Sequence, residues 1–380
     1  MTVYSGLTWD HPRGYQALLA AAKKARSPDF EIRWDRQPLE GFESASIEEL
    51  ARRYDLIVID HPHVGEAVKA GCLRPLEEVF DDAFIRSLGR EAIGPAFSSY
   101  VYAGKSWALP LDAATQVMAV RADLLQQPLP TTWTGVEALA CRKPVCLSLA
   151  GPHAILTFMS ICVALGGPPA DRDPDQFVGT DVGRAAIDIL SSIHARATRA
   201  GLELNPIGIL ERMTRSDDIV LCPLIYGYVN YARAEAGRAH AVTFGNAPTI
   251  APGGRPGSTL GGTGIAVTTR CGVTPALQDH LEWLMSPVTQ ERFIPLEAGQ
   301  PGLRSAWASE TVNAAWANFY RNTAQTLEAA WVRPRYPGYI DFQTEASAIL
   351  RAALEARANP EVTLAKLQDR YARSRTGEPK

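Results

Sequence analysis

The feature that most constrains the fold is a continuous apolar run of strand length at residues 55–60 (DLIVID). Such a run is typical of a parallel strand buried on both faces of a sheet. Two further strands are predicted before it, at residues 2–7 and 30–34, and a helix follows each of them, at residues 15–25 and 46–53. Ser46 is followed three residues later by Glu49, which is a capping signal for the helix at 46–53. Strand and helix alternate, and this order predicts a doubly wound α/β sheet.

The length and charge of the chain narrow the class of protein. A chain of 380 residues is long enough for two hydrophobic cores. Hydrophobic residues make up 46% and charged residues 21%, as in an ordinary soluble protein. The formal net charge of −3 offers no basic field for nucleic acid. No apolar run reaches the roughly 20 residues of a membrane helix, so we expect no membrane-spanning segment.

The remainder of the chain continues the α/β pattern. A hairpin-like stretch begins at residue 104 and becomes a long extended segment that reaches residue 120. Short apolar runs predict three more strands, at residues 145–149, 219–222 and 264–267. Helices are expected at residues 131–139 and 181–197, and almost everything after residue 275 is predicted to be helical.

Aromatic and polar residues follow several of the predicted strands. Trp9, Asp10 and His11 follow the first strand, and Asp60-His61-Pro62-His63 follows the run at 55–60. A third junction of this kind, Gly151-Pro152-His153, leads into a strongly apolar helix. Doubly wound sheets bind ligands in the loops at the carboxyl ends of their strands. These junctions are therefore candidate ligand-binding loops.

The sequence gives little support for a metal site or for an enzyme active site. The His61-x-His63 spacing invites a zinc site, but zinc needs three or four convergent ligands, and only His11 and His153 are available to join from elsewhere. No nucleophile elbow, phosphate loop, zinc-protease motif or dinucleotide fingerprint occurs. We therefore expect neither a metal nor another cofactor, and no enzyme activity.

The six cysteines form no CxxC pair and show no metal-ligand spacing. Unclustered thiols in apolar segments favour a reducing compartment, although the sequence leaves disulfide pairing open. The chain also begins without the pattern of a secretory signal peptide. Both observations favour the cytoplasm, unless a signal peptide has been left out.

Four local motifs, in order across almost the whole chain, resemble the extracellular solute-binding proteins of ABC importers, in their maltose-binding-like branch. The matching segments are residues 104–110 (GKSWALP), 130–133 (PTTW), 257–267 (GSTLGGTGIAV) and 281–287 (LEWLMSP), followed by Gln290 and by Gly299-Gln300-Pro301. Each motif is weak alone, and their combination carries the resemblance. The set of histidines is unlike that of a usual sugar binder.

The resemblance implies a two-lobed periplasmic-binding-protein-like α/β fold, in which each lobe is a mixed sheet flanked by helices and a ligand cleft lies between the lobes. Lobe one would comprise residues 1–110 and 261–310, and lobe two residues 111–260 and 311–380. Hinge crossings would lie near 110–112, 258–262 and 308–312, where Gly261 and Gly262 tolerate changes in backbone angles. The resemblance also implies a periplasmic monomer that serves the membrane subunits of an ABC transporter.

Eleven residues are predicted to contact the ligand: Trp9, Asp10, His11, Asp60, His61, Asp112, Gln116, His153, Tyr226, Tyr228 and Gly262. For some of them a structural role is the alternative: Trp9 as a packing aromatic, Asp10 as a helix cap, and His11 as part of the loop structure. His153 is expected at a helix N-terminus, where an anionic ligand group is favoured. Of Tyr226 and Tyr228, one is expected to face the cleft and the other to pack.

The sequence therefore predicts a binding protein that closes on a small polar ligand and releases it unchanged to an importer. A sugar, a sugar acid or another small carboxylate fits these residues. The histidines and the helix terminus tilt the choice towards a ligand with an anionic group. The alternative is a cytoplasmic enzyme or receptor that has recruited the same fold, with the His and Asp residues as acid-base groups.

Overall fold

The computed structural model describes residues 2–125, 127–171, 173–235 and 237–376. The chain divides into two compact units. Unit 1 is made of residues 1–114, 261–315 and 335–337, and unit 2 of residues 115–260, 316–334 and 338–380. The chain therefore passes from one unit to the other several times. The hinge expected from the sequence stays a prediction.

Unit 1 contains a mixed sheet in the order β2-β1-β3-β9. The strands are β1 (Thr2–Trp9), β2 (Phe30–Gln37), β3 (Leu56–Ile59) and β9 (Leu260–Val267). Strand β1 is parallel to both neighbours, and β9 is antiparallel to β3. All four residues of β3 are buried, as the apolar run predicts. Strands β1 and β2 are longer than predicted because their pairing continues in register from Thr2 with Phe30 to Trp9 with Gln37.

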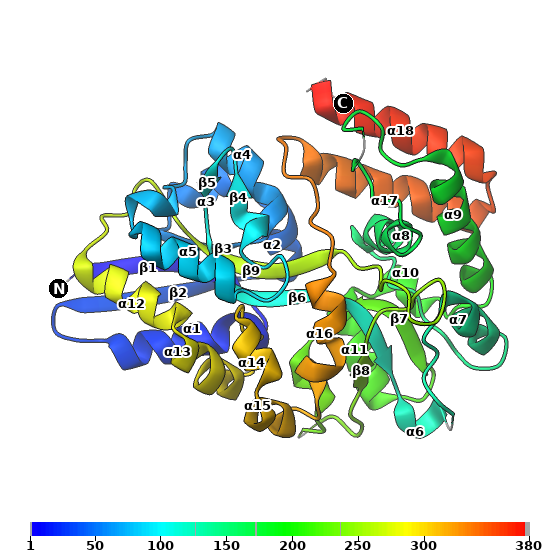
Figure 1. Ribbon diagram of the computed structural model, residues 1–380, viewed down its shortest axis with the longest axis horizontal. Coiled ribbons are helices and arrows are strands. Elements are labelled where there is room, and N and C mark those ends of the chain that lie inside the picture. Colours follow the sequence, from blue (N-terminus) through cyan, green and yellow to red (C-terminus); the bar gives the residue numbers. More distant parts are fainter. Residues whose placement is uncertain (1, 126, 172, 236, 377–380) are drawn as a thin grey trace. The chain divides into compact units, whose positions relative to one another are not determined.

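Helices cover the strands of unit 1, with α1 and α13 on one side and α3 and α4 on the other (Figure 1). The α-helices are α1 (Pro12–Ala25), α2 (Leu39–Ser44), α3 (Ile47–Ala51), α4 (Val64–Lys69), α5 (Asp82–Glu91), α12 (Pro275–Met285), α13 (Pro287–Arg292), α14 (Arg304–Ala308) and α15 (Glu310–Ala315). The 3-10 helices are η1 (His61–His63), η2 (Leu76–Glu78), η3 (Ser98–Tyr100) and η5 (Ile294–Glu297). Strands β4 (Val101–Tyr102) and β5 (Lys105–Ser106) form the predicted hairpin. The Ser46 cap of α3 is confirmed, since its side chain accepts a hydrogen bond from the N–H of Glu49.

Unit 2 is built on the later part of β6 (Leu109–Val120), which pairs antiparallel with both β7 (Leu221–Tyr226) and β8 (Thr243–Gly245). Its α-helices are α6 (Ala122–Leu125), α7 (Trp133–Ala140), α8 (His153–Ala164), α9 (Thr180–His194), α10 (Ala200–Glu203), α11 (Pro206–Arg215), α16 (Phe319–Glu328), α17 (Tyr339–Ala356) and α18 (Pro360–Thr376). One 3-10 helix, η4, spans Val229–Ala232.

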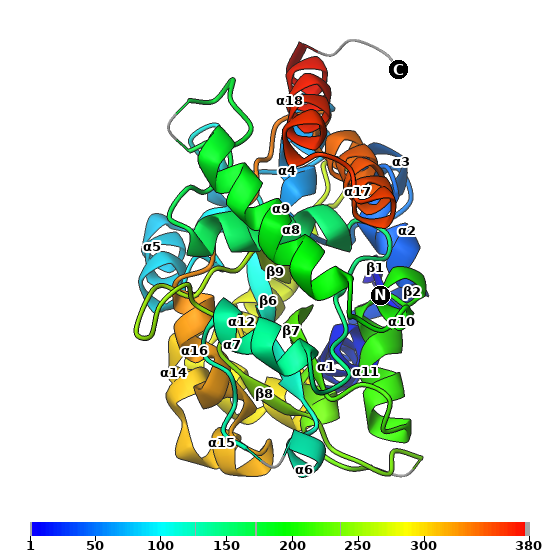
Figure 2. The ribbon, with the colours of Figure 1, turned by 90° about the vertical axis from the view of Figure 1, so that its right-hand side faces the viewer.

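Helix α8 forms the centre of the helical layer of unit 2. Every residue from His153 to Val163 is buried. A helix that is apolar all round needs neighbours on several sides, and α9 and α17 supply them, with α18 packing on both (Figure 2). The apolar composition of this helix therefore reflects its burial among the other helices of unit 2.

The strand predicted at residues 145–149 is wrong. The segment is extended and mostly buried, but it forms only a single bridge, between Val145 and Leu221. Beyond the N–H of Cys146, which donates to the carbonyl of Leu221, its backbone bonds outside the sheet: Thr198 donates to the carbonyl of Val145, and Leu149 donates to that of Gly201. The sheet pairing stops after one bridge because the segment by α10 takes these hydrogen bonds.

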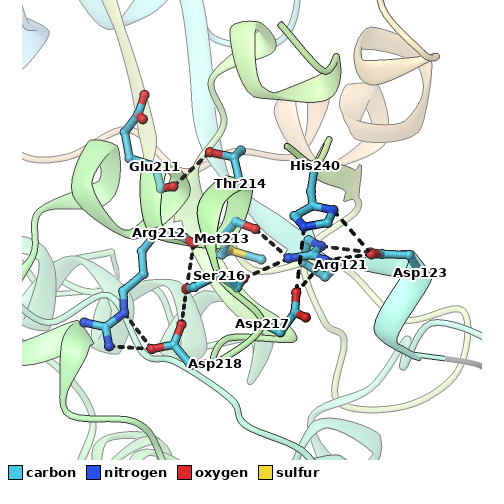
Figure 3. A network of polar contacts seen from close by, with 10 residues as sticks. All are labelled: Arg121, Asp123, Glu211, Arg212, Met213, Thr214, Ser216, Asp217, Asp218 and His240. Atoms are coloured by element: carbon cyan, nitrogen blue, oxygen red, sulfur yellow. Dashed lines mark hydrogen bonds and ion pairs between the residues drawn. The ribbon is translucent and has the colours of Figure 1, made fainter. Parts of the chain in front are cut away.

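Arg121, directly after β6, ties the sheet of unit 2 to the end of α11 (Figure 3). Its guanidinium is fully buried and donates to Asp123 at 2.8 and 2.7 Å and to Asp217 at 2.9 Å. It also donates to the carbonyls of Met213 and Ser216 at 2.9 and 2.8 Å. Arg121 thus caps carbonyls near the C-terminus of the helix, where a cation is favoured. Its hydrogen bond holds the pKa of Asp123 below the usual range.

Gly262 lies in β9 where no side chain fits. Its φ is +91°, and a Cβ there would lie 2.4 Å from the carbonyl oxygen of Asp112. Gly104 has a similar φ of +77°, but a Cβ there would meet nothing within 4 Å. The role of Gly262 in this structure is therefore close backbone packing within unit 1.

We expect Gly262→Ala to lower the free energy of unfolding by about 2–4 kcal/mol, because overpacking adds to left-handed backbone strain. In the matched control Gly104→Ala, the added Cβ causes left-handed backbone strain but no overpacking. We expect this variant to lower the free energy of unfolding by about 1 kcal/mol. Urea denaturation of both variants measures the difference. Equal losses would show that backbone packing does not constrain Gly262.

Candidate ligand-binding residues

Trp9 is the last residue of β1 and does not lie in the following loop, as the sequence suggested. Its ring stacks on that of His11, with centroids 5.3 Å apart and planes only 7° from parallel. Gly14 also packs directly against the Trp9 indole, since a Cβ at Gly14 would lie 2.4 Å from that ring. Trp9 therefore has a packing role in unit 1, and its contact with a ligand stays a prediction.

His11, and not Asp10, caps helix α1. The Nδ1 atom of His11 accepts a hydrogen bond from the N–H of Arg13 at 3.2 Å. Because Nδ1 is an acceptor, the proton of the neutral imidazole lies on Nε2, which is a hydrogen-bond donor. Asp10 points to solvent and pairs with Arg36 at 3.2 Å. The helix starts at Pro12, earlier than predicted, because proline suits the first turn behind this cap.

A buried ion pair joins Arg13 to Asp112, a partner that sequence reasoning missed. The Nε atom of Arg13 donates to Oδ2 of Asp112 at 2.9 Å, and Nη2 donates to Oδ1. The two side chains are only 4% and 6% exposed. Asp112 is thus committed to neutralising Arg13, although 99 residues separate the two in the sequence.

The Gly299-Gln300-Pro301 motif holds the backbone beside Asp112. Ala113 donates to the carbonyl of Gln300 at 2.8 Å, and the side-chain amide of Gln300 donates back to the carbonyl of Ala113 at 3.0 Å. Gln290 accepts from the N–H of Gly302 at 2.8 Å. These contacts explain why Gln290 and Gln300 are part of the motif: both are buried amides that satisfy main-chain groups.

Asp60 and His61 contact each other in the loop that follows β3. The carboxylate of Asp60 accepts from the N–H of His61 at 2.8 Å and lies 3.1 Å from Nδ1 of His61. The His61 ring is fully buried and lies edge-on to Tyr100, with centroids 6.4 Å apart. Tyr100 in turn donates to the carbonyl of Ile59 at 3.1 Å. The loop is therefore preformed, with Pro62 in its first turn.

In unit 2, Gln116 belongs to a buried network of uncharged polar side chains. Its Oε1 accepts from Ser160 at 2.5 Å, and its Nε2 donates to Thr157 at 3.4 Å. Ser258 donates to the main-chain carbonyl of Gln116 at 2.6 Å. The amide thus ties β6 to α8, which is the partner that a polar residue on an apolar strand requires.

His153 begins α8, as predicted, and is fully buried. Burial lowers the pKa of His153 to about 3, and the positive charges of Arg333 and Arg351 add to the effect. The imidazole is therefore neutral at physiological pH. The N–H of Ile155 at this helix end donates to the hydroxyl of Ser347 at 3.1 Å, and the anion contact expected at the N-terminus of α8 stays a prediction.

The two tyrosines differ in their surroundings. Tyr226, the last residue of β7, is half-buried, lies 5.9 Å from the His153 ring and donates to the carbonyl of Leu260 at 3.4 Å. Tyr228 is buried and lies edge-on to Tyr231, 6.3 Å away. Tyr228 is therefore the packing residue, and Tyr226 is the better candidate for ligand contact.

Within the described ranges, no three His, Cys, Asp or Glu side chains are grouped so as to hold a metal ion. None of the described helices combines the length and apolarity needed to cross a bilayer.

The sequence matches the family model for bacterial extracellular solute-binding proteins over residues 17–320. The chain belongs to this family. The resemblance inferred from the four motifs is thus confirmed, and the family description indicates action outside the cytoplasm. No protein with a curated description matches this solute-binding protein significantly.

Solved structures share the fold of this solute-binding protein over nearly its whole length. A solute-binding protein of an ABC transporter from Agrobacterium radiobacter K84, in complex with ribitol, has a TM-score of 0.79 at 19% identity, covering 98% of both chains. A maltose-bound protein of T. maritima has a TM-score of 0.80 at 16% identity, covering 97% of this chain and 98% of its own. An Agrobacterium vitis S4 solute-binding protein with bound D-mannitol has a TM-score of 0.76 at 17% identity, covering 100% of both chains. The predicted periplasmic-binding-protein fold is confirmed.

Removing one partner of the Arg13–Asp112 pair is expected to be costly. Asp112→Ala leaves a buried guanidinium without its counter-charge and should lower the free energy of unfolding by about 3–5 kcal/mol. Replacing both partners, by Arg13→Met with Asp112→Leu, should recover much of this loss. Urea denaturation measures both changes.

The matched control for that measurement is Asp82→Ala, because Asp82 and Arg86 form an exposed pair at 3.6 Å. Its removal should leave stability nearly unchanged. If Asp112→Ala cost no more than Asp82→Ala, the buried pair would not contribute to the stability of unit 1.

The neutral, buried His153 makes stability depend on pH. The unfolded chain protonates this imidazole below about pH 6.5, whereas the folded chain does so only near pH 3. The free energy of unfolding should therefore fall by about 2 kcal/mol through this group between about pH 7.5 and about pH 5. In the variant His153→Gln, the free energy of unfolding should fall by about 2 kcal/mol less between the two pH values than it does in the unmodified protein. Denaturant titrations at both pH values measure this difference. An unchanged pH dependence would mean that His153 is charged in the folded protein.

Proposed function

We propose that this solute-binding protein binds a small, neutral, polyhydroxylated solute, such as a sugar or polyol, and delivers it to the membrane subunits of an ABC importer. The observation that carries the proposal is the family match over residues 17–320. Structurally similar proteins were solved with ribitol, D-mannitol and maltose, all of which are neutral and rich in hydroxyl groups.

The chemistry of the candidate residues supports a neutral ligand. Arg13 is neutralised by Asp112, and the low pKa of His153, caused by burial, keeps its imidazole uncharged. His11 carries an imidazole and Tyr226 a hydroxyl, both of which are polar groups that suit a hydroxylated ligand. Uncharged donors and acceptors suit hydroxyl groups. Together with the neutral ligands of the structural relatives, they favour sugars and polyols, whereas the tilt towards an anionic ligand that the sequence suggested stays an untested alternative.

Binding is proposed to act through a shift in conformation. The candidate residues are Trp9, His11 and His61 of unit 1 and His153 and Tyr226 of unit 2. A solute with a higher affinity for the closed state than for the open one shifts the population towards the closed state. The importer then recognises the closed state. This mechanism rests on the family resemblance.

We further propose that the protein works as a monomer in the periplasm and returns its ligand chemically unchanged. The family description supports a position outside the cytoplasm, and both the family and its structural relatives are binding proteins. If the alternative of an enzyme held, incubation with the true ligand would yield a product, which mass spectrometry of the solution detects.

A thermal-shift screen with neutral sugars, polyols, sugar acids and small carboxylates tests the ligand class. A ligand that binds only the folded state stabilises it by about 2.7 kcal/mol at a hundredfold excess over Kd. We expect hits among neutral sugars or polyols and none among sugar acids or small carboxylates.

The same screen on variants tests the residues. His61→Ala and Tyr226→Ala should reduce the ligand-induced shift, whereas His194→Ala, at the end of α9, should leave it unchanged. The comparison uses the ligand-induced change, so a loss of basal stability does not affect it. Hits confined to sugar acids or carboxylates would overturn the neutral class, and an undiminished shift in both variants would overturn the residue assignment.

A further inference from the structure

Two cysteines of unit 2 lie beside one another on adjacent segments. Val145 and Leu221 form a parallel bridge, and Cys146 donates its N–H to the carbonyl of Leu221 at 2.8 Å. In parallel pairing both chains advance in the same direction, so Cys146 lies next to Cys222, one residue beyond the bridge. Both cysteines are fully buried.

The spacing of this pair suits a covalent bond. Neighbouring strands lie about 4.8 Å apart, and disulfides need Cα atoms about 4.4–6.8 Å apart with both Cβ atoms on the same side. Cys146 and Cys222 directly follow the two bridged residues, and their side chains are close enough to share a hydrogen bond.

The two thiols also interact with each other. The side-chain hydrogen bond with Cys222 lowers the pKa of Cys146, which favours the thiolate that thiol–disulfide exchange requires. Burial, followed by the contact with Cys146, raises the pKa of Cys222 far above its usual value. The two thiols are therefore in contact in the native state.

The remaining cysteines have different surroundings. Cys162 lies within α8, and Cys72 and Cys271 belong to unit 1, where burial raises the pKa of each thiol to about 11 and about 12 respectively. Cys141 is exposed at the end of α7. The register argument that joins Cys146 to Cys222 applies to none of them.

We propose that Cys146 and Cys222 are an oxidation site that forms an intramolecular disulfide in an oxidising compartment. The oxidant is a disulfide, either of low molecular weight or of an oxidoreductase. The thiolate of one of the two cysteines attacks one of its sulfurs, forms a mixed disulfide with it and expels the other sulfur as a thiolate. The second cysteine then loses its proton and attacks the protein sulfur of the mixed disulfide, expelling the second thiolate of the oxidant. One disulfide of the oxidant is reduced to two thiols for each bond formed. Because both sulfurs are buried in the native state, the reaction takes place during folding.

The test uses the full chain with Cys141→Ser, which removes the exposed thiol. The reduced, unfolded protein is refolded with a mixture of reduced and oxidised glutathione at about pH 8.5, where an ordinary thiol is half ionised. It is then alkylated in denaturant and digested. We expect a peptide linked through Cys146 and Cys222, and alkylation of Cys72, Cys162 and Cys271 only.

Variants and stability separate this site from chance oxidation. Cys146→Ser and Cys222→Ser should each abolish the linked peptide and leave the other thiol alkylated, whereas the matched control Cys162→Ser should retain the link. Oxidation should raise Tm by about 5 °C or more, because the bond closes a long loop, and a phosphine reductant should reverse the rise. The inference is overturned if the refolded protein, native by circular dichroism, alkylates Cys146 and Cys222 fully or links a different pair. Neither outcome bears on the ligand, so this test is independent of the proposed function.

Discussion

The structure depends on the complete burial of strand β6, Leu109–Val120, because every polar group on it needs a partner inside the protein. Each polar side chain of this strand has one. Asp112 pairs with Arg13 in unit 1, whereas Thr115 and Gln116 bond to Ser258 and Ser160 in unit 2. The strand leads directly into Arg121, whose buried guanidinium is satisfied in the same way. One of these partners, Ser258, lies in a motif shared with the family.

This constraint also shapes the chemistry available for binding. The one carboxylate on the strand is cancelled by a buried cation, and the neighbouring polar groups are amides and hydroxyls. His11 is oriented by its helix cap, and His153 is kept neutral by burial, which lowers its pKa. The amides, hydroxyls and neutral imidazole around β6 and α8 are of the kind that hydrogen-bonds to hydroxyl groups, as the proposal of a sugar or polyol ligand requires.

Sequence reasoning succeeded where the signal was local. The run at 55–60, the Ser46 cap and the position of His153 at the start of α8 were all predicted from neighbouring residues. It failed where partners are distant. Residues 145–149 were taken for a strand because apolar composition does not reveal that Thr198 and Gly201 take the backbone hydrogen bonds. Arg13 was overlooked because nothing near it in the sequence indicates Asp112.

The sequence by itself determined the family, the α/β class and the junctions that hold most of the candidate residues, because these depend on periodicity and on short motifs. Only the tertiary structure decided which of those residues are already committed to other groups. Asp112 is bound to Arg13, Gln116 to Ser160, and Tyr228 packs on Tyr231, whereas Tyr226 is half-buried. The same holds for the neighbouring thiols of Cys146 and Cys222, which are far apart in the chain. The physical reason is that charge compensation, hydrogen bonding and pKa depend on spatial neighbours, and folding brings those neighbours together from distant parts of the sequence.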